Sequence, residues 1–351
     1  MIAGAELRER GSRLQELAPA ITLIFAAPFV AEVLSGATRL SVIFVFIPES
    51  MVWGCGALII REVVCRWRGG WTSMFLLALA LSTAEEMVIQ QTSIAPLPWP
   101  GANAAYGRAW GVNWIYLLYM LGYESVWVVL VPVLLTYLIF PARRAGRWLS
   151  TRGSIISGGV FLLGSFIAWF AWTQQARPIV LRAAPYRPPA ALITAGLAAI
   201  ALFATAGWGV RNVHTQRSPS RKAPKPALLG MAGFALGMCW NFLIWTIFAA
   251  SAPAPAQVVF VAGVLWAVLA AAVVRRWESA GNWGRMHEYA LVFSAAVVCM
   301  VSSLLQSSAW ARVDQVGAAI MDLIALACLI ALGRKLARDA PHSHRAEPDA
   351  A

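Results

Sequence analysis

The chain has 351 residues, of which 60% are apolar and 13% are charged, and its net charge is +12. A soluble fold of this length cannot hide so much apolar surface from water, which excludes a cytosolic enzyme, a secreted module and a disordered protein and predicts an all-α, polytopic helical membrane protein. The positive charge does not indicate a nucleic-acid interface, because the basic residues lie in short segments between apolar runs, where they set orientation in a lipid bilayer.

A membrane-spanning helix needs about 20 mainly apolar residues. Ten runs of about that length follow one another along the chain, which predicts ten spans. They are expected at 17–36, 46–66, 71–92, 112–140, 154–172, 190–210, 227–250, 258–274, 289–310 and 316–333.

The basic residues favour one orientation of these spans. With the N-terminus inside, 21 Lys and Arg residues fall in inner segments and 6 fall in outer segments. Because positive charge accumulates in cytoplasmic loops, both termini are expected in the cytoplasm (N-in, C-in), in a multi-pass protein of a bacterial inner membrane.

The same pattern divides the chain into five parts. They are a cytoplasmic N-terminal segment (1–16), a six-helix membrane part (17–210), a basic cytoplasmic loop (211–226), a four-helix membrane part (227–336) and a disordered cytoplasmic tail (337–351).

Ionisable residues inside membrane helices are costly and therefore mark candidate functional sites. The acids that qualify, all in the outer halves of their expected spans, are Glu32, Glu49, Glu85, Glu86, Glu124 and Asp322. This one-sided distribution predicts a cavity open toward the outer face. No Lys or His lies within an expected span, so Glu85 and Glu86 are not both expected to be charged unless a cation or an outer Arg reaches them. A bound proton or cation is the one cofactor that these residues indicate.

Three of these acids also have structural interpretations. Glu49 follows Pro48, a pattern typical of a helix start, in which case Leu40–Ile47 would be re-entrant or interfacial. Glu32 could extend to the membrane surface, and Asp322 could hydrogen-bond to a neighbouring helix. Glu85, Glu86 and Glu124 are the strongest candidates for function and are predicted as catalytic residues if the protein is an enzyme.

An aromatic face accompanies Glu124 on the fourth expected span. Tyr116, Tyr119, Tyr123 and Trp127 recur at helical spacing beside it. Such a face indicates core packing, or an aromatic wall suited to a cationic or lipid-like ligand. The candidate binding residues are Gln90, Tyr123, Trp127, Asn241 and Asp322, and the ligand is expected to be a small molecule, lipid or peptide from the outer side. No motif for a metal, nucleotide or haem is present.

The stretch Glu85-Glu86-Met87-Val88-Ile89-Gln90 resembles EExxxR, the first motif of the CAAX-prenyl-protease and bacteriocin-processing (CPBP) family of intramembrane proteases. The region from Ile60 to Pro141 also resembles a group of bacterial polytopic membrane proteins without an assigned function. The CPBP resemblance implies peptide-bond hydrolysis, with Glu85 or Glu86 as the base acting beside histidines of later helices. Here Gln90 stands at the Arg position, and no HxxxN or HxxxD lies in a later span. If Glu124 occupies the histidine position of the family's FxxxH motif, Met120 occupies its aromatic position and the histidine is absent.

Three classes of function therefore remain open. The first is a diverged CPBP-like scaffold, either an active intramembrane protease or an inactive relative. The second is a proton- or cation-coupled small-molecule transporter. The third is a non-catalytic membrane component that binds a lipid or protein partner.

Overall fold

The computed structural model describes residues 2–339 except 100, 185 and 250. Ten of the described helical segments are long and apolar enough to cross a membrane, which confirms the predicted all-α, multi-pass membrane protein. They are Gln15–Val33, Leu40–Trp67, Trp71–Ile89, Trp114–Ile139, Thr151–Val180, Ala190–Gly209, Pro226–Phe248, Ala256–Glu278, Arg285–Ala309 and Arg312–Arg338.

Several spans are built from more than one kind of helix. The α-helices are α1 (Ile2–Pro28), α2 (Phe46–Glu49), α3 (Cys55–Trp67), α4 (Trp71–Ala84), α5 (Trp114–Tyr123), α6 (Val131–Ile139), α7 (Thr151–Phe170), α8 (Ala190–Gly209), α9 (Pro226–Phe248), α10 (Ala256–Glu278), α11 (Arg285–Gln306) and α12 (Arg312–Arg338). The π-helical segments are η1 (Phe29–Val33), η3 (Ser50–Gly54), η4 (Glu85–Ile89), η5 (Glu124–Leu130) and η7 (Ala171–Val180). Short 3₁₀ helices are η2 (Leu40–Val45), η6 (Pro141–Arg143) and η8 (Ser307–Ala309).

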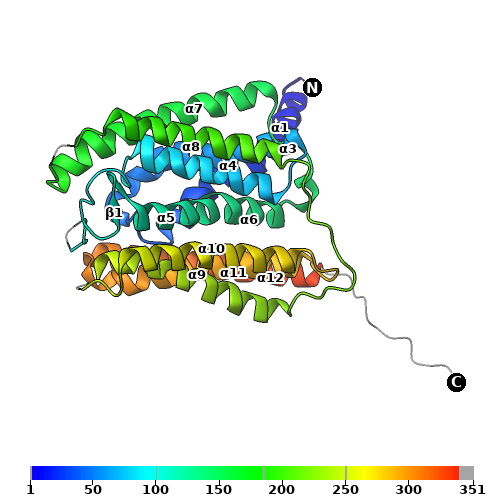
Figure 1. Ribbon diagram of the computed structural model, residues 1–351. Helices are drawn as coiled ribbons and strands as arrows, with labels where there is room; N and C mark the ends of the chain where they lie inside the picture. The colour runs from blue at the N-terminus through cyan, green and yellow to red at the C-terminus, as the bar shows by residue number, and fades with distance from the viewer. Residues whose placement is uncertain (1, 100, 185, 250, 340–351) are drawn as a thin grey trace.

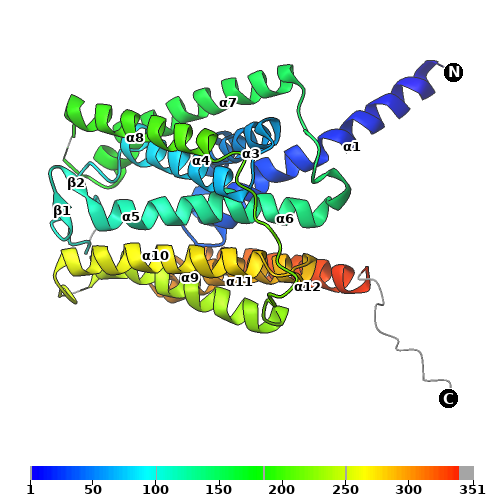
Figure 2. The same ribbon diagram turned by 45° about the vertical axis from the view of Figure 1, so that its right-hand side comes forward.

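The helices pack in layers. In Figures 1 and 2, α4, α7 and α8 lie together on one side, α5 and α6 follow one another through the middle, and α9 to α12 form a layer on the other side. The middle helices contact both neighbours, since η5 packs on α4 while α5 packs on α9 and α6 on α11. η5 itself packs against elements of the six-helix part and reaches α11 through Trp127, whose ring N–H donates to the Ala295 carbonyl.

A two-stranded antiparallel hairpin, β1 (Arg108–Ala109) and β2 (Val112–Asn113), marks one end of the bundle. The start of α1 and the end of α12 both lie at the opposite end, on different sides of the bundle (Figures 1 and 2). We call these the hairpin end and the terminal end. An even number of crossings places both ends of the chain on one side, in agreement with the ten spans.

The structure corrects three details of the sequence prediction. The second span begins at Leu40 as a 3₁₀ helix and continues through Pro48, so Pro48-Glu49 is not a helix start. The fifth span continues through η7 to Val180, which places Arg177 within the span instead of in the following loop. α11 begins at Arg285, so His287 lies in its first turn. Helices begin and end where backbone partners are available, and hydropathy alone does not mark those points.

The limits of two predicted segments also differ from the structure. The segment 1–16 is helical from Ile2, because α1 starts before the membrane-spanning part. The predicted disordered tail 337–351 overlaps the end of α12 at Arg338, and residues 340–351 lie outside the described part of the chain.

Close packing of the first two spans predicts a strong response to one substitution. A Cβ atom on Gly54 would overlap the backbone carbonyl of Ile24, which cannot rotate away. Gly54→Ala is expected to destabilise the protein by about 1–3 kcal/mol through overpacking, measured as a lower melting temperature in detergent. Gly158→Ala on α7 is the matched control, because a Cβ there meets nothing within 4 Å. Equal melting temperatures for the two variants would contradict this packing.

Candidate carboxyl site

The π-helical segments, which are wider than α-helix, occur at the acidic residues of the spans. Glu32 lies in η1, Glu85 and Glu86 open η4, Glu124 opens η5, and Glu49 immediately precedes η3. A π-helical turn shifts the following side chains and leaves backbone groups less regularly paired, and such turns are frequent at functional sites. Because η5 contacts both η1 and η3 and packs on α4, the widened turns meet one another in the bundle.

These five side chains form one group, which we call the glutamate cluster. The Glu124 carboxyl lies within charge–charge range of Glu85, Glu86 and Glu32. Glu32 lies within the same range of Glu49, Glu85 and Glu86. Glu85 and Glu86 are each 1% exposed, Glu124 is 3% and Glu49 is 5% exposed, whereas Glu32 is half-buried. The predicted candidates Glu85, Glu86 and Glu124 are thus brought together, and the structure adds Glu32 and Glu49 to them.

The cluster has few hydrogen-bond partners within the described residues. The Ser93 hydroxyl donates to Glu86 Oε2 at 2.6 Å, and the Thr38 hydroxyl donates to Glu49 Oε1. Both carboxyl oxygens of Glu85 and one oxygen each of Glu49 and Glu124 have no partner. Buried polar atoms are normally paired, so unpaired ones need an explanation such as a bound ion or proton.

No basic side chain compensates the cluster in the described part of the chain. The ion pairs found there join Arg61 and Arg66 to Glu62, and Arg144 to Glu288. The outer arginines that the sequence offered as partners are used elsewhere. Arg108 donates to the carbonyls of Ala95, Ile94 and Gly111, and Arg39 lies 5.3 Å from the centre of the Trp310 ring.

A loop covers the cluster at the hairpin end. Residues 91–95, which follow η4, are all buried, and Ser93 within them contacts Glu86. Asn113 holds this loop through its N–H, which donates to the Ser93 carbonyl at 2.8 Å. The carboxyls are therefore enclosed in this structure, where the sequence predicted a cavity open to one side.

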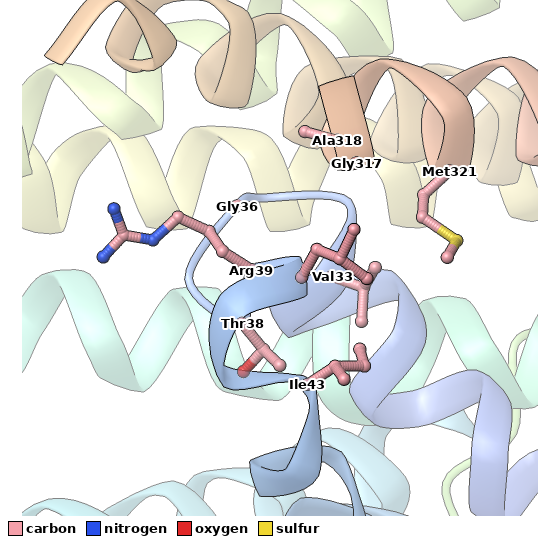
Figure 3. Close-up of a pocket in the computed structure, with 9 residues that line it drawn as sticks. Val33, Gly36, Thr38, Arg39, Ile43, Gly317, Ala318 and Met321 are labelled. Atoms are coloured by element: carbon pink, nitrogen blue, oxygen red, sulfur yellow. The ribbon is translucent and has the colours of Figure 1, made fainter. Parts of the chain in front are cut away.

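A small cavity approaches the cluster from the side of Thr38. Its lining residues are Val33, Gly36, Thr38, Arg39, Leu40, Ile43, Gly317, Ala318 and Met321. Figure 3 shows Thr38, in the connection before the second span, and Ile43 of that span opposite α12, with the Arg39 side chain directed away from them. Because the Thr38 hydroxyl also donates to Glu49, this cavity is one side chain away from the cluster.

The aromatic face of the fourth span forms a continuous stack. The Tyr119 and Tyr123 rings lie 5.5 Å apart, and the Tyr123 and Trp127 rings lie 5.2 Å apart. Tyr123 donates to the Ala31 carbonyl and Trp127 to the Ala295 carbonyl, so the stack ties this span to the first and ninth spans. Trp127 is therefore occupied in packing, whereas Tyr123 lies near Glu32 at the edge of the cluster.

The remaining candidates lie in three different surroundings. Gln90 lies beside the Glu85 carboxyl. Asn241 accepts from the Tyr119 hydroxyl at 3.2 Å and donates to the Ser302 hydroxyl at 2.6 Å, which places it between spans and away from the acids. Asp322 lies on α12, which packs on α11 and η2, and its Oδ1 has no partner among the described residues. The structure does not bring Asp322 into the glutamate cluster.

An ion-pair network at the terminal end was largely missed by sequence reasoning. Glu62 pairs with Arg66 at 3.2 Å, as its spacing predicted, but its closer partner is the adjacent Arg61 at 2.6 Å. Glu62 also accepts from the backbone N–H of Trp148 at 2.9 Å, and the Arg61 guanidinium lies 3.7 Å from the centre of the Trp148 ring. The adjacent Arg61 and Glu62 inside an apolar run were the sequence signal for this network. Its other members lie more than 80 residues further along the chain, so the sequence did not identify them.

The cluster offers carboxyl oxygens, which are not the donor set of a transition-metal centre. Among the described residues, no group of three or more His, Cys, Asp or Glu side chains is arranged to hold a metal ion. The chemistry available to the cluster is that of carboxyl groups, which bind protons and monovalent cations or act as general acids and bases.

Comparison with family models finds no match to this sequence. Comparison with curated proteins and with solved structures likewise finds no similar protein.

Proposed function

We propose that this membrane protein is a transporter coupled to protons or monovalent cations, with the glutamate cluster as the coupling site. The observation that carries the proposal is that four buried glutamates and the half-buried Glu32 each lie within charge–charge range of at least two others, with no basic partner among the described residues. Two carboxylates about 5 Å apart repel by about 3 kcal/mol even at an effective dielectric constant near 20. Bound protons or cations therefore reduce the repulsion between the carboxylates. Acids within membrane helices commonly form part of ion and proton pathways.

Ion occupancy is the first property to test. Purified protein in detergent is titrated with sodium, potassium and lithium salts against choline chloride at fixed ionic strength, and across pH from about 5 to 9. We expect the melting temperature of the wild type to depend on cation, on pH or on both. Glu86→Gln should weaken that dependence, and Glu16→Gln, an exposed acid on α1, should retain it. A wild-type melting temperature that responds to neither would contradict the proposal.

A second candidate is a diverged CPBP-like protease scaffold. One observation favours it: Glu124, if it occupies the position of the histidine in the family's FxxxH motif, lies within charge–charge range of Glu85 and Glu86 on a neighbouring span. Carboxyls facing one another can act as base and acid in hydrolysis. The test is incubation of the reconstituted protein with labelled transmembrane peptides and detection of cleavage by mass spectrometry, with Glu86→Gln as the inactive control. Cleavage by wild type alone would favour this candidate over transport.

The proposed orientation places the terminal end in the cytoplasm and the hairpin end outside, in a bacterial inner membrane. The support is the excess of Lys and Arg in the segments assigned to the inner side, 21 against 6. A phosphatase reporter fused after Leu336 is expected to be inactive, and a fluorescent reporter at the same position should fluoresce. Phosphatase activity from that fusion would reverse the orientation and with it the side from which the cluster is approached.

A further inference from the structure

A second polar cavity lies at the hairpin end, separate from the cavity beside Thr38. It is lined by Gln90, Gln91, Ala95, Thr173, Arg177, Pro178, Ala184 and Tyr186. Arg177 is the charged residue of this lining, and no acid belongs to it. The cavity is thus positively charged, in contrast to the glutamate cluster.

Arg177 is held in an unusual state for an arginine. It is only 4% exposed, its Nη2 donates to the Pro96 carbonyl at 2.9 Å, and its Nη1 has no partner among the described residues. A buried guanidinium without full pairing is costly, so the fold keeps it there against a free-energy penalty. The nearby Arg108 adds positive charge and has its own donors engaged by backbone carbonyls.

The other lining residues supply neutral donors around Arg177. Gln90, Gln91 and Tyr186 line the same small cavity; the Gln91 amide also donates to the Val88 carbonyl at 3.2 Å, and the Tyr186 hydroxyl lies within charge–charge range of Arg177. A planar guanidinium with neutral donors beside it matches the oxygens of a carboxylate or phosphate, which Arg binds through paired N–H donors. An anion would satisfy the free Nη1 and neutralise the cavity.

We propose that this cavity is a binding site for an anionic carboxylate or phosphate group, with Arg177 as its charged ligand. The site stands independently of the proposed coupling function. It lies at the end of a span, where either the headgroup of an anionic lipid or the anionic group of a solute can enter. Gln90 lines the cavity and also lies beside Glu85, so an anion here would lie next to the glutamate cluster.

The test uses the full chain in detergent and in nanodiscs. In the solute arm, binding of phosphate and acetate is measured by thermal shift against chloride at equal ionic strength. In the lipid arm, nanodiscs of phosphatidylcholine with or without phosphatidylglycerol are compared, and retained lipid is identified by native mass spectrometry. Arg177→Gln is expected to lower the affinity for the anion by at least about ten-fold, because a charge-assisted hydrogen bond is lost. Arg187→Gln, at an exposed arginine in the connection that follows η7, is the matched control.

Each outcome decides the proposal. Stabilisation by phosphate or acetate that is lost in Arg177→Gln and kept in Arg187→Gln supports a solute site. Selective retention of phosphatidylglycerol with the same dependence supports a lipid site. If Arg177→Gln fails to fold, Tyr186→Phe, which removes only a hydroxyl, should still weaken binding measurably. A wild type indifferent to all of these anions, or equal losses in Arg177→Gln and Arg187→Gln, would overturn the proposal.

Discussion

Glu86→Gln is expected to lower coupled transport by ten-fold or more, about the effect of losing one essential proton-transfer group, while leaving the fold nearly intact. Gln has the size of a protonated Glu, and its amide oxygen can still accept the hydrogen bond from Ser93. Gln cannot exchange a proton, however, so the cluster loses the proton-exchanging group at the second position of η4. The readout is ion-gradient-driven pH change inside proteoliposomes that contain a pH-sensitive dye.

Matched variants distinguish a role of Glu86 in coupling from a purely structural role. Glu124→Gln is expected to behave like Glu86→Gln, because the two carboxyls lie within charge–charge range of each other. The Pro48-Glu49 pattern is typical of a helix start, but Glu49 is buried and accepts from Thr38, so it belongs with the test variants and not with the controls. Glu16→Gln provides the control. Loss of stability in Glu86→Gln without loss of flux would identify a structural carboxyl and would remove the coupling proposal.

The number of spans could be predicted from the sequence because bilayer thickness fixes the length of an apolar run. That argument depends on length and hydropathy only, and it holds for runs as different as Ala190–Gly209 and Arg285–Ala309. It fails at span ends. Leu40–Val45 is as apolar as a membrane helix but forms 3₁₀ turns beside α12, a tertiary contact that hydropathy does not contain.

The acids of the site could be found from the sequence because charge is rare in membrane helices. Their convergence could not, since it depends on which spans are neighbours: η5 meets η1, η3 and α4 only in the folded bundle. The π-helical turns that present these side chains also have no sequence signature of their own. The fifth span was expected to end at residue 172, which left Arg177 in the following loop, whereas the structure places it within the span, where it lines a separate cavity.

Arg61→Met is expected to destabilise the protein by about 3–5 kcal/mol, the usual cost of removing one partner of a buried ion pair. The Arg61 side chain is 0% exposed and joins Glu62 to the carbonyls of Arg144 and Gly146. Without it, the Glu62 carboxylate keeps only Arg66, whose side chain is 27% exposed, and the backbone N–H groups of the loop. The measurement is the melting temperature in detergent together with size-exclusion profiles after heating.

A double-mutant cycle separates the lost pair from lost packing. Arg66→Met should cost less than Arg61→Met, because the Arg66 side chain is 27% exposed and water can replace part of its contact with Glu62. Arg61→Met combined with Glu62→Gln should cost less than the sum of the two single variants, because no unpaired charge then remains buried. Met is nearly as long as Arg and can still pack against Trp148. The substitution therefore removes the cation–π contact with Trp148 while leaving little empty volume. Equal effects of Arg61→Met and Arg66→Met, or strict additivity with Glu62→Gln, would show that this pair does not hold the loop after α6 in place.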